Sequence, residues 1–416
     1  MTNLEDRTKR ISLIGIIVGI LSLSGCTHQS DTQMEKLPLQ PPILVNEIPE
    51  TADIIFPSIR YVLDDTACLD NHHKLKDRFI HDPKCSKKIY DPKVGIASPR
   101  QLFVLDLETG EVIQITNTDY FFVSGQVVDP VTIMTNAATA DTNNDGTIND
   151  KDLTQLHLLD VATGEMECLT CELGLEAINN PDYSHVHKKI VFSARKGSAA
   201  NLNHLYTIDL QKNVVQLTDD AEYMDFDCSW SEDGTKIVFS RLPSPWFEKP
   251  SQVWLMDSDG DNLEKITDGG SNLYDEGPHG VYPIGIDADP DLSPDNKKIV
   301  FSRLKTGGEN EPFGVYQLIT IDVDTKKEYI LDSHYANMVP EWKEEGILFI
   351  RQIGAEDPMD RKQSLYLYKD GEFVELERFP YNVFPVGAFG GSFIELEYRT
   401  LYFFVFMVFN LSVCNN

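Results

Sequence analysis

One short apolar segment returns along the chain at a spacing of roughly fifty residues, and this repeat constrains the fold more than any other feature. It reads KIVFSAR at 189–195, KIVFSR at 236–241 and at 298–303, and GILFIR at 346–351, with a fainter DIIF at 53–56. Short runs of β-branched and aromatic residues bounded by turn residues are typical of β-strands. The chain is therefore predicted to repeat one strand-based unit.

A β-hairpin accompanies these strands in every unit. The clearest copy runs from Gln101 to Thr116, with Thr109-Gly110 at its turn. Asp-Gly and Thr-Gly corners supply the positive φ angles that tight hairpins require. Further copies begin at Gln155, His204, Gln252, Tyr316 and Ser364. With the turn sequences SEDG at 231–234 and SPDN at 293–296, each unit is expected to contain an inner strand, a buried strand and a closing hairpin.

Repeated four-stranded units leave exposed edges in an open array, whereas a closed ring protects them. We therefore expect an all-β fold, a six-bladed β-propeller, because six hairpin copies occur in the sequence. Seven blades are the alternative. The segment 384–416, which is very apolar at 401–409, either closes the ring against the first blade, adds a blade or forms an irregular tail.

The combined pattern of an SPDG-like turn, a KIVFS strand and an Asp-Gly hairpin resembles the propeller repeats of the TolB C-terminal domain and of similar WD40-like repeat proteins. The resemblance covers about residues 52–377. TolB carries an α/β domain before its propeller, and here a short polar segment leads almost directly into the first unit. The resemblance therefore implies a propeller but no membership of the Tol-Pal machinery.

The N-terminal residues have the composition of a secretory signal. Arg7, Lys9 and Arg10 precede an apolar run at 11–23, and Ser24-Gly25-Cys26 follows. This arrangement resembles a lipobox, the site at which bacterial lipoproteins are cleaved and acylated. We expect residues 1–25 to be the signal peptide and Cys26 to be lipidated. An uncleaved membrane anchor is the alternative, and both place the remaining chain outside the cytoplasm.

The chain after Cys26 is expected to divide into two parts. Residues 26–50 are polar and rich in proline, which favours an extended tether, and residues 51–416 form the propeller. The formal net charge of −30 excludes nucleic acid as a partner, since a phosphate backbone needs clustered basic residues. The predicted location is the bacterial cell envelope, with the lipid as the contact to the membrane.

The cysteines suggest one disulfide and leave one pair open. In an oxidising compartment Cys68 and Cys85 are expected to pair, because they share one loop-like insertion. Cys168 and Cys171 form a CxxC motif, interpreted as a local disulfide or two free thiols. A zinc site would require a second matching pair, and a c-type haem would require histidine where Glu172 stands.

The loop at 141–152, DTNNDGTINDKD, fits the calcium-loop pattern D-x-[DN]-x-[DN]-G with an acid at position twelve. Aspartate at that last position resembles dockerin loops more than calmodulin-type EF-hands. Gly146 permits the sharp turn, and Ile148 is expected to point inward. An Asn-Asp-Gly turn without an ion is the alternative. The predicted ligands of a structural calcium ion are Asp141, Asn143, Asp145, Thr147 through its carbonyl, Asn149 through water, and Asp152.

Three weaker candidates remain. Five aspartates lie on predicted inner strands, where they either ring the channel mouth and bind a cation or basic ligand, or cap turns: Asp225, Asp227, Asp287, Asp289 and Asp291. His185 and His187 form an HxH motif that is more typical of a surface turn than of a metal site. The loop 274–283, with His279 and Tyr282, interrupts the repeat and is a candidate lid.

Recognition or scaffolding is the leading functional prediction, with a protein, peptide or glycan as ligand and no catalytic residues. The prediction depends partly on fold analogy. TolB-like propellers resemble the gating domain of prolyl-oligopeptidase-type peptidases, but this sequence has no G-x-S-x-G motif. The enzyme alternative is a metal-dependent polysaccharide lyase or another hydrolytic propeller enzyme, which would need histidines converging on the central axis.

Overall fold

The structure is a computed structural model of the chain. The signal peptide, Cys26, the tether up to residue 45, the Cys68–Cys85 pair and the segment 384–416 lie outside the residues that it describes. The described residues are 46–49, 54–59, 100–105, 112–116, 118–144, 146, 148, 152–197, 202–243, 249–270, 274–277, 280–283, 285–308, 311–344, 346–353 and 362–379.

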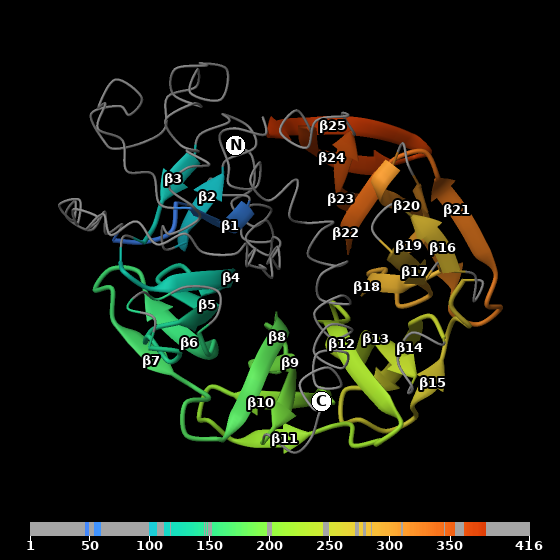
Figure 1. Ribbon diagram of the computed structural model, residues 1–416. Coiled ribbons are helices and arrows are strands. Elements are labelled where there is room, and N and C mark those ends of the chain that lie inside the picture. The colour runs from blue at the N-terminus through green and yellow to red at the C-terminus, as the bar shows by residue number, and fades with distance from the viewer. Residues whose placement is uncertain are drawn as a thin grey trace, which may run out of the picture.

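Five antiparallel sheets of four strands each surround a common centre, and β4, β8, β12, β18 and β22 are their innermost strands (Figure 1). The first two blades in chain order are β4 (Phe121–Asp129), β5 (Thr132–Ala138), β6 (Gln155–Asp160) and β7 (Met166–Cys168), then β8 (Leu175–Ser184), β9 (Lys189–Lys196), β10 (His204–Asp209) and β11 (Val214–Gln216). The third blade contains β12 (Tyr223–Trp230), β13 (Lys236–Pro243), β14 (Gln252–Asp257) and β15 (Glu264–Lys265). The last two blades are β18 (Asp287–Leu292), β19 (Lys298–Gly308), β20 (Glu311–Asp322) and β21 (Glu328–Asp332), then β22 (Ala336–Lys343), β23 (Gly346–Ile353), β24 (Lys362–Lys369) and β25 (Glu372–Phe379).

A smaller sheet stands beside the first blade. It contains β1 (Ile54–Ile59), β2 (Arg100–Leu105) and β3 (Val112–Gln114), in that order. The expected lid segment forms a separate hairpin of β16 (Tyr274–Gly277) and β17 (Gly280–Pro283). Among the described residues there is no helix that is long and apolar enough to cross a membrane.

The all-β propeller prediction is confirmed, but the described part of the chain shows five complete blades and not the six or seven predicted. The first hairpin copy belongs to the three-stranded sheet. The sequence count treated every hairpin as a full blade. It could not count inner strands, because these are too polar and too different from one another to be recognised as a repeat.

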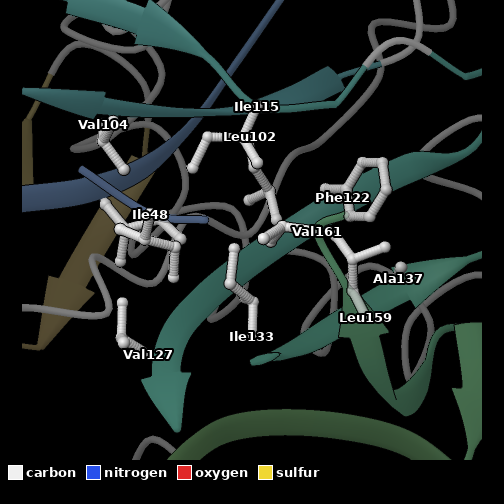
Figure 2. Close-up of a cluster of buried hydrophobic side chains, with 11 residues drawn as sticks. Ile48, Leu102, Val104, Ile115, Phe122, Val127, Ile133, Ala137, Leu159 and Val161 are labelled. Carbon is white, nitrogen blue, oxygen red and sulfur yellow. The ribbon is translucent and has the colours of Figure 1, made fainter. Parts of the chain in front are cut away.

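Side chains of the repeated strand point alternately to the two faces of its blade, and both sets are buried in the core. On β9, Ile190 and Phe192 belong to one buried cluster, and Val191 belongs to the next cluster together with Phe239 of β13. Successive side chains of a strand point to opposite faces, so one strand contributes to the packing on both sides of its blade. Figure 2 shows the corresponding cluster between the three-stranded sheet and blade β4–β7, where Leu102 and Phe122 are fully buried.

The inner strands share an irregularity that matters for the site. β8, β12, β18 and β22 each carry a shift in register against the second strand of the blade. A residue with a left-handed backbone lies at each shift: Asn180, Asp227, Asp289 and Val339, with φ between 48° and 50°. β-Bulges redirect side chains locally, and here they occur on the innermost strand of each of these four blades.

Candidate functional site

Polar side chains of the inner strands link one blade to the next. Gln126 Nε2 donates to Asp182 Oδ1 (2.8 Å), and Gln126 Oε1 accepts from the Tyr183 backbone N–H (2.6 Å). Asp182 Oδ2 in turn accepts from the Trp230 backbone N–H of the following blade (2.7 Å). A side chain at the bulge of one blade therefore fixes the inner strand of its neighbour.

The same chain of hydrogen bonds continues through the next two blades. Ser229 Oγ donates to Asp291 Oδ1 (2.8 Å), and Asp291 Oδ2 accepts from the Trp342 backbone N–H (2.6 Å). We call Gln126, Asp182, Ser229 and Asp291 the axial cluster. Because its members come from four blades, the cluster holds the described part of the ring together near the axis.

Two carboxylates of the inner strands, Asp291 of the axial cluster and Asp227, have raised pKa values. Burial raises the pKa of Asp291 to about 7, although the nearby Lys343 ammonium acts in the opposite direction. Burial, followed by the Asp289 carboxylate, holds the pKa of Asp227 well above its usual range. The Asp289 backbone N–H lies 3.4 Å from Asp227 Oδ2. Asp227 and Asp289 are thus close together and partly shielded from water, and Asp291 is buried.

The predicted ring of channel aspartates is only partly present. Asp227 and Asp289 lie together, and Asp291 contacts Ser229 and Trp342 instead. Asp225 and Asp287 are engaged with arginines of the second strands. Asp225 binds Arg241 through both carboxylate oxygens, at 2.5 and 2.9 Å. Although burial opposes ionisation, hydrogen bonds from His204 and Arg241 lower the pKa of Asp225. Asp225 and Asp287 are structural ion-pair partners and do not line the channel mouth.

Sequence reasoning missed Gln126, Asp182 and Ser229. For Asp182 and Ser229 the available signal was their position immediately before an aromatic residue, in Asp182-Tyr183 and Ser229-Trp230, whereas Gln126 precedes Val127 and has no such signal. The inner strands are polar and share no motif. The visible repeat in the sequence therefore marks the apolar second strand of each blade and not the register of the inner strand.

A shallow cleft opens between blades β18–β21 and β22–β25. Its volume is about 420 Å³. It is lined by Lys298, Thr320, Tyr329, Leu331, Trp342, Lys343, Glu344, Gly346, Ile347, Tyr368, Lys369 and Asp370. An adjoining hollow shares Lys298, Trp342 and Lys343 and extends to Ser293, Pro294 and Asp295. Aromatic rings, cations and carboxylates therefore meet in one concave surface.

Two cleft residues connect this surface to the axial cluster. Trp342 donates its backbone N–H to Asp291 and contributes its side chain to the cleft lining. Lys343 pairs with Glu341, and although burial opposes its charge, Glu341 and Asp291 hold the pKa of Lys343 above its ordinary value. The position of both cleft residues is therefore set by the inner strand β22 and its bonds to the neighbouring blade.

The histidines of the HxH motif have separate contacts. His187 Nε2 lies 2.7 Å from the Gly234 carbonyl oxygen, and its ring packs on Trp230. His185 packs edge-to-face on Tyr183, and burial lowers its pKa. His279 lies outside the described residues, so the structure does not place the third predicted histidine.

The acidic loop is described at 141–144, 146, 148 and 152, and the predicted ligands Asp145, Thr147 and Asn149 lie outside that description. Asp152 is buried, and its Oδ1 accepts from the Thr142 and Asn143 backbone N–H groups at 2.7 and 3.1 Å. The Gly146 N–H donates to Asp141 Oδ2 at 2.8 Å. These bonds bring the two ends of the loop together.

Two further features of this loop concern its backbone and its apolar residue. Gly146 has a φ of 91°, in the left-handed region that favours glycine. Ile148 packs against the cluster of Phe121, Val123 and Ala138. The apolar residue of the loop thus joins the core of the first blade, as expected from the sequence.

The CxxC cysteines, Cys168 and Cys171, form a disulfide at the outer edge of blade β4–β7. Buried His157 of β6 lies beside them. No sequence motif associates His157 with these cysteines, because His157 and Cys168 become neighbours only through the register of β6 and β7.

No family model matches the sequence, and no curated protein matches it. Similar solved structures include TolB from Acinetobacter baumannii, at 17% identity and a TM-score of 0.47, covering 68% of this chain and 59% of that chain. A putative TolB from Agrobacterium tumefaciens has 16% identity and a TM-score of 0.47, covering 66% of this chain and 87% of that chain. An oligogalacturonate lyase in complex with manganese has 14% identity and a TM-score of 0.42, covering 68% and 71%. The chain thus spans about three-fifths of the length of the Acinetobacter TolB.

Proposed function

We propose that this protein is a recognition module of the bacterial cell envelope that binds a saccharide chain in the cleft between blades β18–β21 and β22–β25. The composition of the cleft is the observation that carries this proposal. Binding sites for small ligands are concave, mostly apolar and supplied with a few oriented polar groups. Here Trp342, Tyr329 and Tyr368 provide aromatic surface, and lysines and carboxylates surround them.

The mixture of charges favours a sugar over a purely anionic or apolar ligand. Hydroxyl groups both donate and accept hydrogen bonds, so they can use lysine ammonium groups and carboxylates in the same site. Lys298 and Lys369 are donors at the cleft, and Glu344 and Asp370 are acceptors. The C–H face of a sugar ring is apolar and suits an aromatic side chain, which has an apolar body and a polar edge.

Membrane attachment and calcium are parts of the same proposal. The lipobox-like sequence before Cys26 supports lipidation at that residue, with residues 26–45 as a tether between lipid and propeller. The tether expected at 26–50 is too long at its end, because Ile48 is buried in the core and donates its N–H to the Pro130 carbonyl. The bonds of Asp141 and Asp152 within the acidic loop support a structural calcium site, and the predicted ligands at 145, 147 and 149 would complete it. Neither feature has a catalytic role in this account.

The enzyme alternative has no specific observation in its favour. In the part of the chain that the structure describes, one group of three or more His, Cys, Asp or Glu side chains is close enough to share a metal ion, and it consists of His157, Cys168 and Cys171. That group lies on the outer strands of blade β4–β7, away from the inner strands. Of the histidines that this alternative requires, the described ones, His185 and His187, contact Tyr183 and Trp230 separately.

The proposal is tested by screening the full chain against immobilised saccharides and repeating the screen with two double variants. Lys298→Ala with Lys369→Ala removes cleft donors, and binding is expected to fall at least about tenfold, the equivalent of 1.4 kcal/mol. Lys196→Ala with Lys249→Ala removes two lysines that do not line the cleft and should leave binding unchanged. Equal binding by both double variants, or no saccharide bound by the parent chain, would refute the proposal.

A further inference from the structure

The outer edge of blade β4–β7 holds a cluster of metal-ligating atoms outside the cleft. His157 on β6 is paired across the sheet with Cys168 on β7, and Cys171 follows three residues later. A ring nitrogen of His157 and the two sulfur atoms lie within 4.8 Å of one another. Two cysteines and one histidine are a ligand set that suits zinc, which prefers nitrogen and sulfur donors in a tetrahedral arrangement.

The segment between the cysteines is fixed without help from the disulfide. Leu169 and Thr170 are buried. The Leu169 N–H donates to the Leu156 carbonyl (2.8 Å), and Thr170 Oγ1 accepts from the Leu156 N–H (3.0 Å). Thr170 Oγ1 also donates to Gln155 Oε1 (2.6 Å). Because these bonds anchor the segment to β6, the two sulfurs should stay close to His157 after the disulfide is cleaved.

Hydrogen bonds also orient His157 and stabilise the thiolate of Cys168 as metal ligands. His157 Nδ1 lies 2.9 Å from the Gln155 carbonyl oxygen, and donation of its N–H there leaves the lone pair of the other ring nitrogen available. Histidine ligands of metals usually donate their second ring N–H in this way, which fixes the tautomer. The Cys171 backbone N–H donates to Cys168 Sγ at 3.0 Å. A donor to sulfur favours the thiolate, the form that binds metal.

We propose that this cluster is a redox-gated zinc site: His157, Cys168 and Cys171 bind one Zn²⁺ when the disulfide is reduced and release it when the disulfide forms. A dithiol reductant supplies the two electrons. Its thiolate attacks the sulfur of the exposed Cys171, the disulfide bond breaks, and Cys168 leaves as a thiolate. The second thiolate of the reductant then releases Cys171, and the reductant departs as a disulfide.

Zinc binding follows reduction of the disulfide and releases protons from the cysteines. After reduction the two cysteines carry two protons when both are thiols, and Zn²⁺ binding displaces both of them. His157 supplies the third ligand, and the fourth position stays open to water or another ligand, as in zinc sites with three protein ligands. Formation of the disulfide removes both thiolates at once, so the oxidised chain retains a single ligand of the three.

The experiment measures metal binding by the full chain in its two redox states. Protein treated with a dithiol and desalted without oxygen is titrated with Co²⁺ in millimolar calcium, which occupies oxygen-rich sites. One equivalent of Co²⁺ should bind to the reduced chain with thiolate-to-cobalt charge-transfer absorption, and Zn²⁺ should displace it. The disulfide form should show no such absorption. Absence of this band in the reduced chain would overturn the proposal.

Variants separate this cluster from other cysteines. Cys171→Ser changes an exposed side chain, so it does not disturb the core, and it should weaken Co²⁺ binding at least about tenfold, as should His157→Gln. Cys228→Ser, at a buried cysteine of another blade, should retain one equivalent. Thermal unfolding verifies that each variant is folded. Unchanged cobalt affinity in Cys171→Ser would place the site elsewhere and refute the assignment.

Discussion

Arginine at the end of the repeated strand pairs with an aspartate of the inner strand in two blades. Arg241 and Asp225 are joined by two hydrogen bonds, and the Arg241 guanidinium lies over the rings of Tyr223 and Trp254, each 5.0 Å away. The equivalent pair in the next blade, β18–β21, is Arg303 with Asp287, and Arg303 also pairs there with Glu328. Removing one partner of such a pair leaves a buried charge without compensation.

Asp225→Ala is therefore expected to lower the free energy of unfolding by about 3–5 kcal/mol. The measurement is denaturant unfolding at constant pH and salt. Asp268→Ala is the control, because Asp268 pairs with Lys265 on the surface, where its side chain is 85% exposed, and ion pairs of that kind contribute little. Equal losses in the two variants would contradict the importance of the buried pair.

Asp291 gives the protein a pH-dependent stability. Its pKa is raised from 3.8 to about 7 in the folded chain, so between these values the folded state holds a proton that the unfolded state has released. The contribution of Asp291 to the free energy of unfolding is therefore greatest at low pH and is lost as the pH rises from about 4 to about 7. At pH 8 the folded chain carries the full cost of a buried carboxylate.

Asp291→Asn removes this titration and retains an acceptor for the Trp342 N–H. We expect the variant to be more stable than the parent at pH 8 by about 1–4 kcal/mol, and the difference to shrink toward pH 4. Unfolding free energies measured at several pH values check this. A difference that does not vary with pH would show that Asp291 is ionised throughout.

At the level of elements, the sequence predicts the second strands and hairpins well and the inner strands poorly. KIVFS strands alternate between two cores and must be apolar, so they repeat visibly, as at 189–195 and 236–241. Inner strands such as β8 and β12 contact polar groups of the neighbouring blade. Different polar residues can form these hydrogen bonds, so the inner strands do not share a repeated sequence. The axial cluster and the cleft depend on this contact between blades, which no local pattern records.

The bulge of β22 contains a residue that the equivalent strands avoid. Val339 has a φ of 48°, a conformation that is unfavourable for β-branched side chains, whereas Asn180, Asp227 and Asp289 occupy this position elsewhere. Val339→Asn should raise the free energy of unfolding by about 1 kcal/mol. Val215→Asn, on the exposed strand β11, is the control and should bring no gain. Destabilisation by Val339→Asn would mean that its side-chain contacts outweigh the strain.

The acidic loop provides a second prediction at this level. If calcium joins Asp141 and Asp152, the ion stabilises the folded chain by about 2.7 kcal/mol at a hundredfold excess over its dissociation constant. Calcium added to chelator-treated protein should then raise the unfolding temperature of the parent and not that of Asp141→Ala. No binding at millimolar calcium by calorimetry, or the same response in the variant, would leave the loop as an Asn-Asp-Gly turn.

The whole molecule combines a strongly acidic chain with a cleft in which three lysines meet aromatic rings. A ring of blades places this cleft beside the inner strand β22, whose position is set by Asp291 of the preceding blade. The acidic surface disfavours polyanions in general, so a ligand of the cleft must be recognised by local contacts. The proposed lipid and tether would hold this surface near the membrane.

Replacement of Cys26 tests the anchoring directly. Cys26→Ser removes the sulfur that would carry the lipid, so the protein is expected to move from the membrane fraction to the soluble fraction of bacterial cells. Mass spectrometry of the parent should show an acylated N-terminus at residue 26. Persistent membrane association of the variant would contradict the lipoprotein assignment, and Cys228→Ser serves as the control for loss of a cysteine.

Hydrogen exchange of the full chain, with and without a saccharide identified in the screen, locates the bound saccharide on the ring of blades. If the saccharide lies between blades β18–β21 and β22–β25, exchange should slow in β21 and around Trp342 to Gly346 and Lys369 to Glu372, with little change in blade β8–β11. Protection confined to other blades, or no protection at saturating ligand, would contradict this placement.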